Sequence, residues 1–218
     1  MTTVEKSVRQ ARRERTYLAL HNAALDLVEE KGLKATTTDE IADRAGVSPR
    51  TLFNYFAGKE DAVLGLRTPA LTAEVLQQDA ARHEAPFIER LVHLALGIIV
   101  ASVDGPTYAR VLEQVDRYPE LRYRMRLHNI ECENVLREFL LSLDWQTFQQ
   151  RNRRGPFVFR EATSAPATDV QDRAHAVVNM TTAVLRHLDF VRGIPESARR
   201  DELIRQAVAT FRYLLREG

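Results

Sequence analysis

Few residues of this chain have types and spacings that could do chemistry, and those few favour contacts with a polyanion. Between Val47 and Lys59 there are two basic residues, Arg50 and Lys59, and no acidic residue. The acidic residues of this region lie instead in the segments 26–30 and 39–43. This segregation predicts one surface that faces DNA and another that faces solvent, because clustered cations attract phosphates.

No arrangement of residues predicts a catalytic centre or a metal site. The six histidines are scattered, and no close pair of them is joined by cysteine or carboxylates at the spacing of zinc ligands. The sequence contains no glycine-rich phosphate loop, no Gly-x-Ser-x-Gly elbow and no His-Glu-x-x-His motif. The single cysteine, Cys132, is open to two interpretations, a redox sensor or a buried and unreactive thiol. We therefore expect a protein that is not an enzyme and that uses no metal or cofactor.

The composition indicates a globular protein without a membrane span. Of 218 residues, 44% are hydrophobic and 28% are charged, and the net charge is +1, so overall charge does not by itself indicate a nucleic-acid partner. A single cysteine cannot form an internal disulfide, as expected in the cytoplasm. The first thirty residues contain no apolar signal-peptide core. The longest apolar run, residues 91–103, is shorter than the roughly 20 residues that a bilayer span needs. We expect no membrane partner and a cytoplasmic location.

The spacing of apolar side chains predicts two helices near the N-terminus. The first runs from about Arg9 to Lys31, and Gly32 would end it in a left-handed conformation. Thr37 followed three residues later by Glu40 forms a capping box, which places the start of a second helix at Thr37. This second helix is short, because Gly46 interrupts it.

Two further helices follow directly. Ser48 caps a helix well and Pro49 is tolerated at its first position, so a third helix is expected over Pro49–Phe56. Its predicted buried residues are Leu52, Phe53 and Phe56. A fourth helix begins at Gly58 and carries acidic residues in its first turn.

Two short helices separated by a glycine-containing turn are what a helix-turn-helix requires. Ala42 is small enough to let the two helices cross closely, and Gly46 can adopt the backbone angles of the turn. Ile41, Val47 and Leu52 are the expected shared core. The helix after the turn would then lie in the major groove of DNA and present its outward side chains to the bases.

A resemblance to the TetR family of bacterial repressors is carried by residues 35–60, which read ATTTDEIADRAGVSPRTLFNYFAGKE. It covers about residues 10–66, less than a third of the chain. It rests on the capping threonines, the Ala-Gly-Val turn, the Leu-Phe-Asn-Tyr-Phe helix and the Lys-Glu pair at family spacing. Beyond residue 66 the resemblance implies only the general helical architecture.

The resemblance implies a set of DNA-contacting residues. They are Thr37, Thr38, Arg44, Ser48, Arg50, Thr51, Asn54, Tyr55 and Lys59, together with Arg12 and Arg13 as an N-terminal arm. Thr37 and Thr38 match positions that hold a phosphate at a helix N-terminus, and Lys59 matches a phosphate-gripping lysine. Arg50 could pair with guanine and Asn54 with adenine in the major groove. Many family members have Tyr at the position of Phe53, where the hydroxyl meets a phosphate, so that contact is absent here.

Proline and glycine divide the rest of the chain into further helices, which makes an all-α protein of about nine to ten helices. The expected ranges are 69–82, 86–103, 106–117, 119–143 with a possible extension to 150, 168–192 and 196–216, with a loop over 151–167. Thr168 with Gln171 is a second capping box. We divide the chain into residues 1–66, a helix-turn-helix DNA-binding domain with a basic arm, and residues 67–218, a helical ligand-binding and dimerisation domain.

A single helix-turn-helix reads only a few base pairs, so a homodimer with reading helices ~34–36 Å apart is expected to read a palindromic operator. The long helices over 119–143, 168–192 and 196–216 are the candidates for the interface, and the resemblance implies the last two. The candidate apolar lining of a ligand pocket consists of Leu94, Ile98, Leu136, Phe139, Trp145 and Phe148. The effector would be a small apolar or amphipathic molecule.

The sequence thus predicts a double-stranded-DNA-binding repressor that a small ligand releases from its operator. A ligand-independent activator or architectural DNA-binding protein is the alternative. A helical interaction protein without preference for any DNA is a third possibility.

Overall fold

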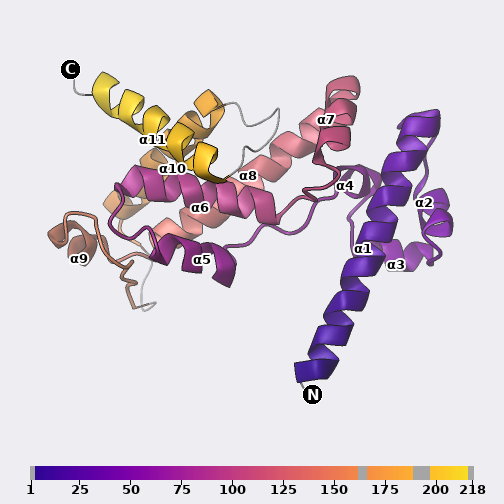
Figure 1. The fold of residues 1–218 in the computed structure, drawn as a ribbon, viewed down its shortest axis with the longest axis horizontal. Coiled ribbons are helices and arrows are strands. Elements are labelled where there is room, and N and C mark those ends of the chain that lie inside the picture. Colours follow the sequence, from indigo (N-terminus) through magenta and orange to yellow (C-terminus); the bar gives the residue numbers. More distant parts are fainter. Residues whose placement is uncertain (1–2, 162–165, 189–196, 216–218) are drawn as a thin grey trace. The chain divides into compact units, whose positions relative to one another are not determined.

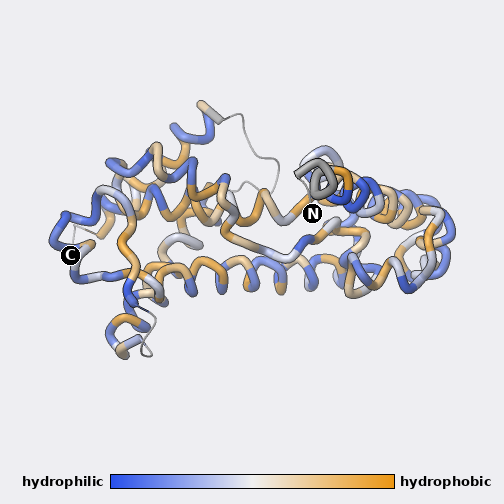
Figure 2. Tube along the Cα trace, turned by 90° about the horizontal axis from the view of Figure 1, so that it is seen from below, coloured by the Kyte–Doolittle hydropathy of each residue, from blue (hydrophilic) through white to orange (hydrophobic). Residues whose placement is uncertain are grey.

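The computed structural model describes residues 3–161, 166–188 and 197–215, and these residues form eleven helices and no strand (Figure 1). One isolated antiparallel bridge joins Leu143 and Phe159. The predicted all-α class is confirmed, with one helix more than the upper expected number. Polar and apolar residues alternate along most helices, so that each has one face to bury (Figure 2).

The helices follow the chain in a simple order. They are α1 (Thr3–Lys31), α2 (Thr38–Arg44), α3 (Pro49–Phe53), α4 (Lys59–Leu64), α5 (Ala73–Ala80), α6 (Phe87–Ala101), α7 (Tyr108–Arg117), α8 (Pro119–Leu141), α9 (Trp145–Gln150), α10 (Thr168–Leu188) and α11 (Ser197–Leu214).

The chain divides into two compact units. The first contains residues 1–68 and 103–128, and the second contains residues 69–102 and 129–218. The first unit therefore includes α7 and the start of α8, because Val111 and Leu121 are buried in the same core as α1. The functional boundary after residue 66 remains a prediction, since packing alone does not test which part binds DNA.

In the first unit, the observed helix ends differ from two expectations. The first helix begins at Thr3 rather than near Arg9. The third ends at Phe53 rather than Phe56, and the chain continues in a turn in which the Tyr55 and Phe56 amides donate to the Leu52 carbonyl at 2.9 Å. The predicted starts at Ser48 and Gly58 and the end at Gly32, whose φ is +87°, are confirmed.

In the second unit, the expected long helix from Pro119 is interrupted. The helix α8 ends at Leu141, and Asp144 caps α9, accepting a hydrogen bond from the Thr147 amide at 3.0 Å. The predicted capping box of Thr168 and Gln171 is wrong, because Thr168 is the first helical residue of α10 and not its cap. The Gln171 backbone amide donates to the Ala167 carbonyl at 3.1 Å, and the Gln171 side-chain Nε2 donates to the Pro166 carbonyl at 2.9 Å.

The remaining ranges agree with the predictions in part. The helix expected over 69–82 is shorter, because Thr72 caps it and it ends at Ala80. The expected end of α10 near residue 192 and both expected ends of α11, at 196 and 216, lie outside the described residues.

The core of the second unit contains a fully buried ion pair. Arg90 donates to both carboxylate oxygens of Asp79, at 2.9 and 2.6 Å, and to the carbonyl of Gly155 at 2.7 Å. Its guanidinium also lies 3.9 Å from the ring centroid of Phe157. Arg90 thereby joins α5, α6 and the loop after α9. Aromatic side chains of α6, α8 and α9 belong to the apolar core of the same unit.

Candidate functional site

The helix-turn-helix of α2 and α3 is built on a closed apolar core. Ile41, Ala42 and Leu52 are all fully buried, and Val47 packs against the same core from the turn. Because Ala42 has only a methyl group, α2 and α3 can approach closely there. The predicted shared core is confirmed.

The turn between the two helices is a Schellman motif. Gly46 has φ +68°, its amide donates to the Asp43 carbonyl at 3.0 Å, and the Val47 amide donates to the Ala42 carbonyl at 2.9 Å. Ser48 then begins α3, and its side chain accepts from the Thr51 amide at 3.2 Å. The turn thus sets the direction in which α3 leaves the core.

Three side chains of α3 and its C-cap point into solvent on one face. Arg50, Phe53 and Asn54 are exposed and are spaced three and four residues apart, which places them together on a helix. Within the described part of the chain, no carboxylate pairs with the Arg50 guanidinium. Arg50, Phe53 and Asn54 are called the reading face below.

Phe53 corrects one prediction. The sequence pattern assigned it to the buried side of the third helix, but 56% of its surface is exposed, whereas Phe56 is 2% exposed. The reason is that α3 ends at Phe53, so the turn at 54–56 carries Phe56 back into the core. Sequence reasoning therefore missed Phe53 as a candidate contact, although the family resemblance marked its position.

The other residues predicted for this helix make contacts within the protein. The Ser48 and Thr51 hydroxyls lie 2.9 Å apart and form a hydrogen bond with each other. Tyr55 is half-buried against the core, and the Arg13 guanidinium lies 5.9 Å from the centroid of its ring. The structure thus brings the end of α3 next to the basic part of α1.

The N-terminus of α2 is closed by the predicted capping box. The Thr37 hydroxyl donates to Glu40 at 2.9 Å and accepts from the Glu40 amide at 3.3 Å, and the Thr37 amide donates to Glu40 at 3.0 Å. Lys31 also donates to this carboxylate, and these bonds, that from Lys31 first, lower the pKa of Glu40 to about 2. Thr38, the first helical residue, is half-buried.

Two of the predicted cations already have partners. Arg44 donates to both oxygens of Glu30, at 2.5 and 2.7 Å, which lowers the pKa of that carboxyl. The Lys59 ammonium donates to the carbonyls of Leu33 and Thr36, at 2.9 and 3.1 Å. Because an ammonium has three donors, Lys59 retains one for a phosphate. Its contacts with DNA remain a prediction.

The expected N-terminal arm is helical. Arg12 and Arg13 lie inside α1, and the Arg12 carbonyl accepts from the Thr16 hydroxyl at 3.1 Å. Both side chains are exposed. They therefore stand on a rigid helix, and a contact with phosphates is compatible with this position.

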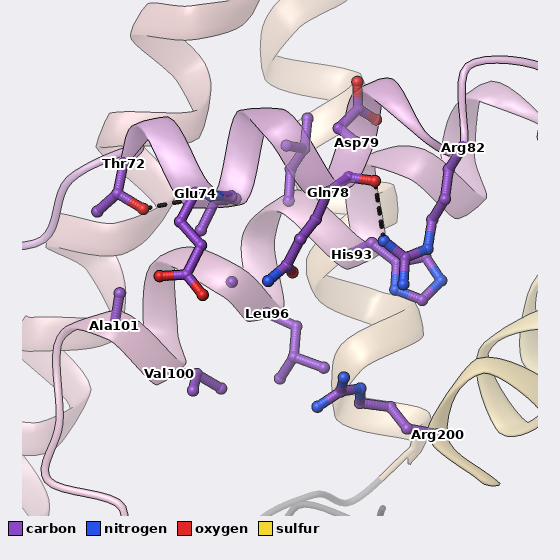
Figure 3. A pocket seen from close by; sticks show the side chains of 13 residues that line it. Thr72, Glu74, Gln78, Asp79, Arg82, His93, Leu96, Val100, Ala101 and Arg200 are labelled. Atoms are coloured by element: carbon purple, nitrogen blue, oxygen red, sulfur yellow. Dashed lines mark hydrogen bonds between the residues drawn. The ribbon is translucent and has the colours of Figure 1, made fainter. Parts of the chain in front are cut away.

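The second unit contains a hollow between α5 and α6 (Figure 3). It has a volume of about 220 Å³ and is lined by both acidic and basic side chains, with Arg200 contributed by α11. His93 lies at its edge. Burial, reinforced by the charges of Arg82 and Arg200, lowers the pKa of this histidine to about 4, whereas Asp201 opposes the shift.

The six residues predicted to line a ligand pocket are mostly packed side chains. Leu94 borders the hollow of Figure 3, and Trp145 borders a second hollow beside α10. The other four belong to the closed core of the second unit. They are Ile98, Leu136, Phe139 and Phe148. The ligand-lining role of all six remains a prediction.

We also searched the described part of the chain for a metal site, a reactive thiol and a membrane span. No cluster of three or more His, Cys, Asp or Glu side chains there could hold a metal ion. Cys132 is buried, which raises the pKa of its thiol to about 11 and favours the unreactive interpretation. None of the helices in the described ranges combines the length and apolarity of a membrane span.

The chain is similar to known bacterial regulatory proteins, and the family model matches its N-terminal region. Residues 20–64 match the family model described as bacterial regulatory proteins, tetR family. The chain is 30% identical over 139 residues to the HTH-type transcriptional regulator TcmR of Streptomyces glaucescens, an alignment covering 59% of this chain and 60% of that protein. It is also 30% identical over 108 residues to the uncharacterized HTH-type transcriptional regulator YvkB of Bacillus subtilis, covering 45% and 57% of the two chains.

These alignments span less than two thirds of either relative. Among solved structures, a putative TetR-family transcriptional regulator from Syntrophomonas wolfei is 18% identical, with a TM-score of 0.44 over 93% of this chain and 95% of that one.

Proposed function

The chain belongs to the TetR family of bacterial regulatory proteins, and on this premise we propose that it is a homodimeric transcriptional repressor that binds a palindromic operator. The observation that carries this proposal is the exposed reading face of Arg50, Phe53 and Asn54. It stands on a helix whose other side is anchored by the fully buried Leu52.

The chemistry of the reading face fits the edges of base pairs. A guanidinium can donate two hydrogen bonds to guanine, a carboxamide can pair with adenine, and an exposed phenyl ring can contact a thymine methyl group. Arg12, Arg13 and Lys59 supply positive charge nearby, which suits the phosphate backbone. The short α3 is rigid, since the Schellman turn and the Ser48 cap hold its start.

A dimer is supported by apolar side chains at the end of α11. Tyr213 and Leu214 are 64% and 60% exposed, which is unusual for two adjacent large side chains on a helix. The helices α10 and α11 pack against each other, and two such pairs could form a four-helix interface. The dimer would set the spacing of the two reading helices.

Release by a small apolar or amphipathic ligand is the second part of the proposal. Such a ligand must bind the DNA-incompetent spacing of the reading helices more tightly than the competent one. The hollows of the helical second unit offer space for it.

The decisive experiment is selection of bound fragments from genomic and random DNA with the full-length protein. We expect a recovered site with two-fold symmetry, and binding that weakens as salt rises. Recovery of fragments without any shared sequence would contradict the proposal. The position of the recovered sites relative to promoters separates repression from activation.

A further inference from the structure

Two hollows of the second unit share one floor. One has a volume of about 340 Å³ and the other about 390 Å³, and both are lined by Phe87, Ile88 and Arg153. Trp145 of α9 and Val177 of α10 complete the first, and Val208 of α11 completes the second. The floor is therefore apolar and partly aromatic.

The floor is firmly built. The ring of Phe87 packs edge-on against Trp145, with centroids 5.7 Å apart, and against Phe148, with centroids 5.2 Å apart. The Trp145 indole donates to the Leu140 carbonyl at 2.9 Å, so its polar atom is satisfied. What these rings offer to an occupant is thus apolar surface.

Every charged side chain that lines the two hollows is an arginine. Arg153 belongs to both, Arg173 to the first, and Arg154 and Arg212 to the second. Within the described ranges, no carboxylate pairs with Arg153, Arg154 or Arg212, and Arg173 has only the exposed Asp169 at 3.6 Å. This differs from the hollow of Figure 3, where Glu74 and Asp79 stand among the basic groups.

The backbone at Arg153 is held in an unfavourable conformation. Asn152 and Arg153 both lie in the left-handed region, with φ of 53° and 57°. The Arg153 amide donates to the Phe148 carbonyl at 3.0 Å, and the Gly155 amide donates to the His83 carbonyl at 2.8 Å. These bonds keep the loop in place, and such strain is concentrated at functional sites.

We propose that these joined hollows bind an amphipathic organic anion, whose carboxylate meets Arg153 and its neighbouring arginines and whose apolar body lies on Phe87, Ile88 and Trp145. Guanidinium groups pair with carboxylates in bidentate geometry, and a cleft lined by one sign of charge concentrates the opposite ion. The binding site itself does not depend on the proposed function. Only the role of this anion as the effector rests on it.

The test uses the full-length protein and the fluorescence of Trp145, which is the only tryptophan of the chain. Octanoate, octanol and octylammonium carry the same apolar tail with a negative, a neutral and a positive head. We expect octanoate to change the fluorescence saturably and to bind at least about tenfold more tightly than octanol, because one or two charged hydrogen bonds are worth that factor. Octylammonium is expected to bind more weakly still.

Two variants locate the site, and a third serves as control. Arg153→Gly removes the guanidinium and relieves the left-handed strain, so it should weaken octanoate binding about tenfold without lowering the thermal midpoint. Arg212→Ala, on another element, should also weaken it. Arg151→Ala changes an exposed arginine of the same loop that lines neither hollow, and it should bind octanoate as the wild type does.

Equal binding of octanol and octanoate, or equal weakening in Arg151→Ala and Arg153→Gly, would overturn the proposal. These measurements contain no DNA, so they decide the site even if fragment selection recovers no operator. A shift of the protein–operator complex by octanoate, lost in Arg153→Gly, would support the effector role. Binding of octanoate that leaves that complex unchanged would overturn the effector role alone.

Discussion

The two arginines of α2 and α3 differ in whether another side chain of the protein binds them. The Arg50 guanidinium extends into solvent, whereas the Arg44 guanidinium is held by both oxygens of Glu30. Of these two arginines on neighbouring helices, we propose Arg50 as the one that reads a base, and the contact of Arg44 with DNA stays a prediction. The difference comes from the partner that α1 supplies to α2.

We expect Arg50→Ala to relax the preference for one base position by about 1–3 kcal/mol, since a bidentate pair with guanine would be lost. Fluorescence anisotropy with the selected operator and its single-base variants measures this. Lys59→Ala is the contrasting variant and should weaken binding to all sequences alike, since a phosphate contact carries no base preference. The same loss of preference in both variants would contradict the assignment.

Phe53 and Phe56 provide a second test, because the same residue type occurs twice on opposite sides of one turn. Phe53→Ala should weaken operator binding and change the stability by less than about 0.5 kcal/mol, as the ring is exposed. Phe56→Ala should lower the free energy of unfolding by about 3–5 kcal/mol, because it leaves a cavity in the core. Denaturant unfolding of both variants checks the contrast, and similar losses of stability would refute it.

His93 predicts a pH dependence of stability. Its pKa is about 4 in the folded protein, below its ordinary value of 6.5, so the unfolded chain binds this proton more readily. The stability that neutral His93 contributes is fully present above pH 6.5 and is lost as the pH falls through about 4. We expect the thermal midpoint of His93→Leu to fall less steeply than that of the wild type between these pH values. If the thermal midpoints of the two proteins fell in parallel with pH, the prediction would be wrong.

At the scale of elements, the ends of the helices decide which side chains meet. The helix α4 ends at Leu64 and is followed by its C-cap Gly65, whose φ is +59°. A Cβ at Gly65 would lie 2.9 Å from the His21 ring. The His21 ring in turn lies 2.7 Å from both the Ala62 carbonyl and the Thr107 hydroxyl. The tight turn therefore lets α4 dock on α1.

Gly65→Ala should consequently destabilise the protein more than Gly46→Ala. Both glycines are left-handed, and an alanine in that conformation costs about 1–2 kcal/mol. Only at Gly65 would the added Cβ also clash with a neighbouring atom, since nothing lies within 4 Å of a Cβ at Gly46. Thermal unfolding of the two variants decides this. A larger loss in Gly46→Ala would show that the His21 ring can move aside.

At the scale of the whole molecule, the proposal depends on pairing of two chains. Leu214→Glu places a charge at the exposed apolar end of α11. We expect this variant to be monomeric in analytical ultracentrifugation and to bind the full palindrome no more tightly than a half-site, because the second reading helix is lost. Leu76→Glu changes an exposed leucine of α5 and should remain dimeric. A dimeric Leu214→Glu variant would place the interface elsewhere.

Helix ends with strong local signals were predictable from the amino-acid sequence. The Thr37–Glu40 capping box, the left-handed Gly46 and the Ser48–Pro49 start are local interactions within a few residues, so their spacing was sufficient to predict them. The core positions Ile41, Ala42 and Leu52 followed from the helical period. The family resemblance then indicated which surface faces DNA.

Which side chains are exposed and which are bound to other groups of the protein depends on how distant segments pack. Phe53 is exposed because α3 stops early, Lys59 is bound to two carbonyls of a loop more than twenty residues away, and Arg90 is buried on Asp79. The arginines of the joined hollows come from the loop after α9, from α10 and from α11. These contacts form between segments that are distant in the chain, so the local spacing of residue types in the sequence does not predict them.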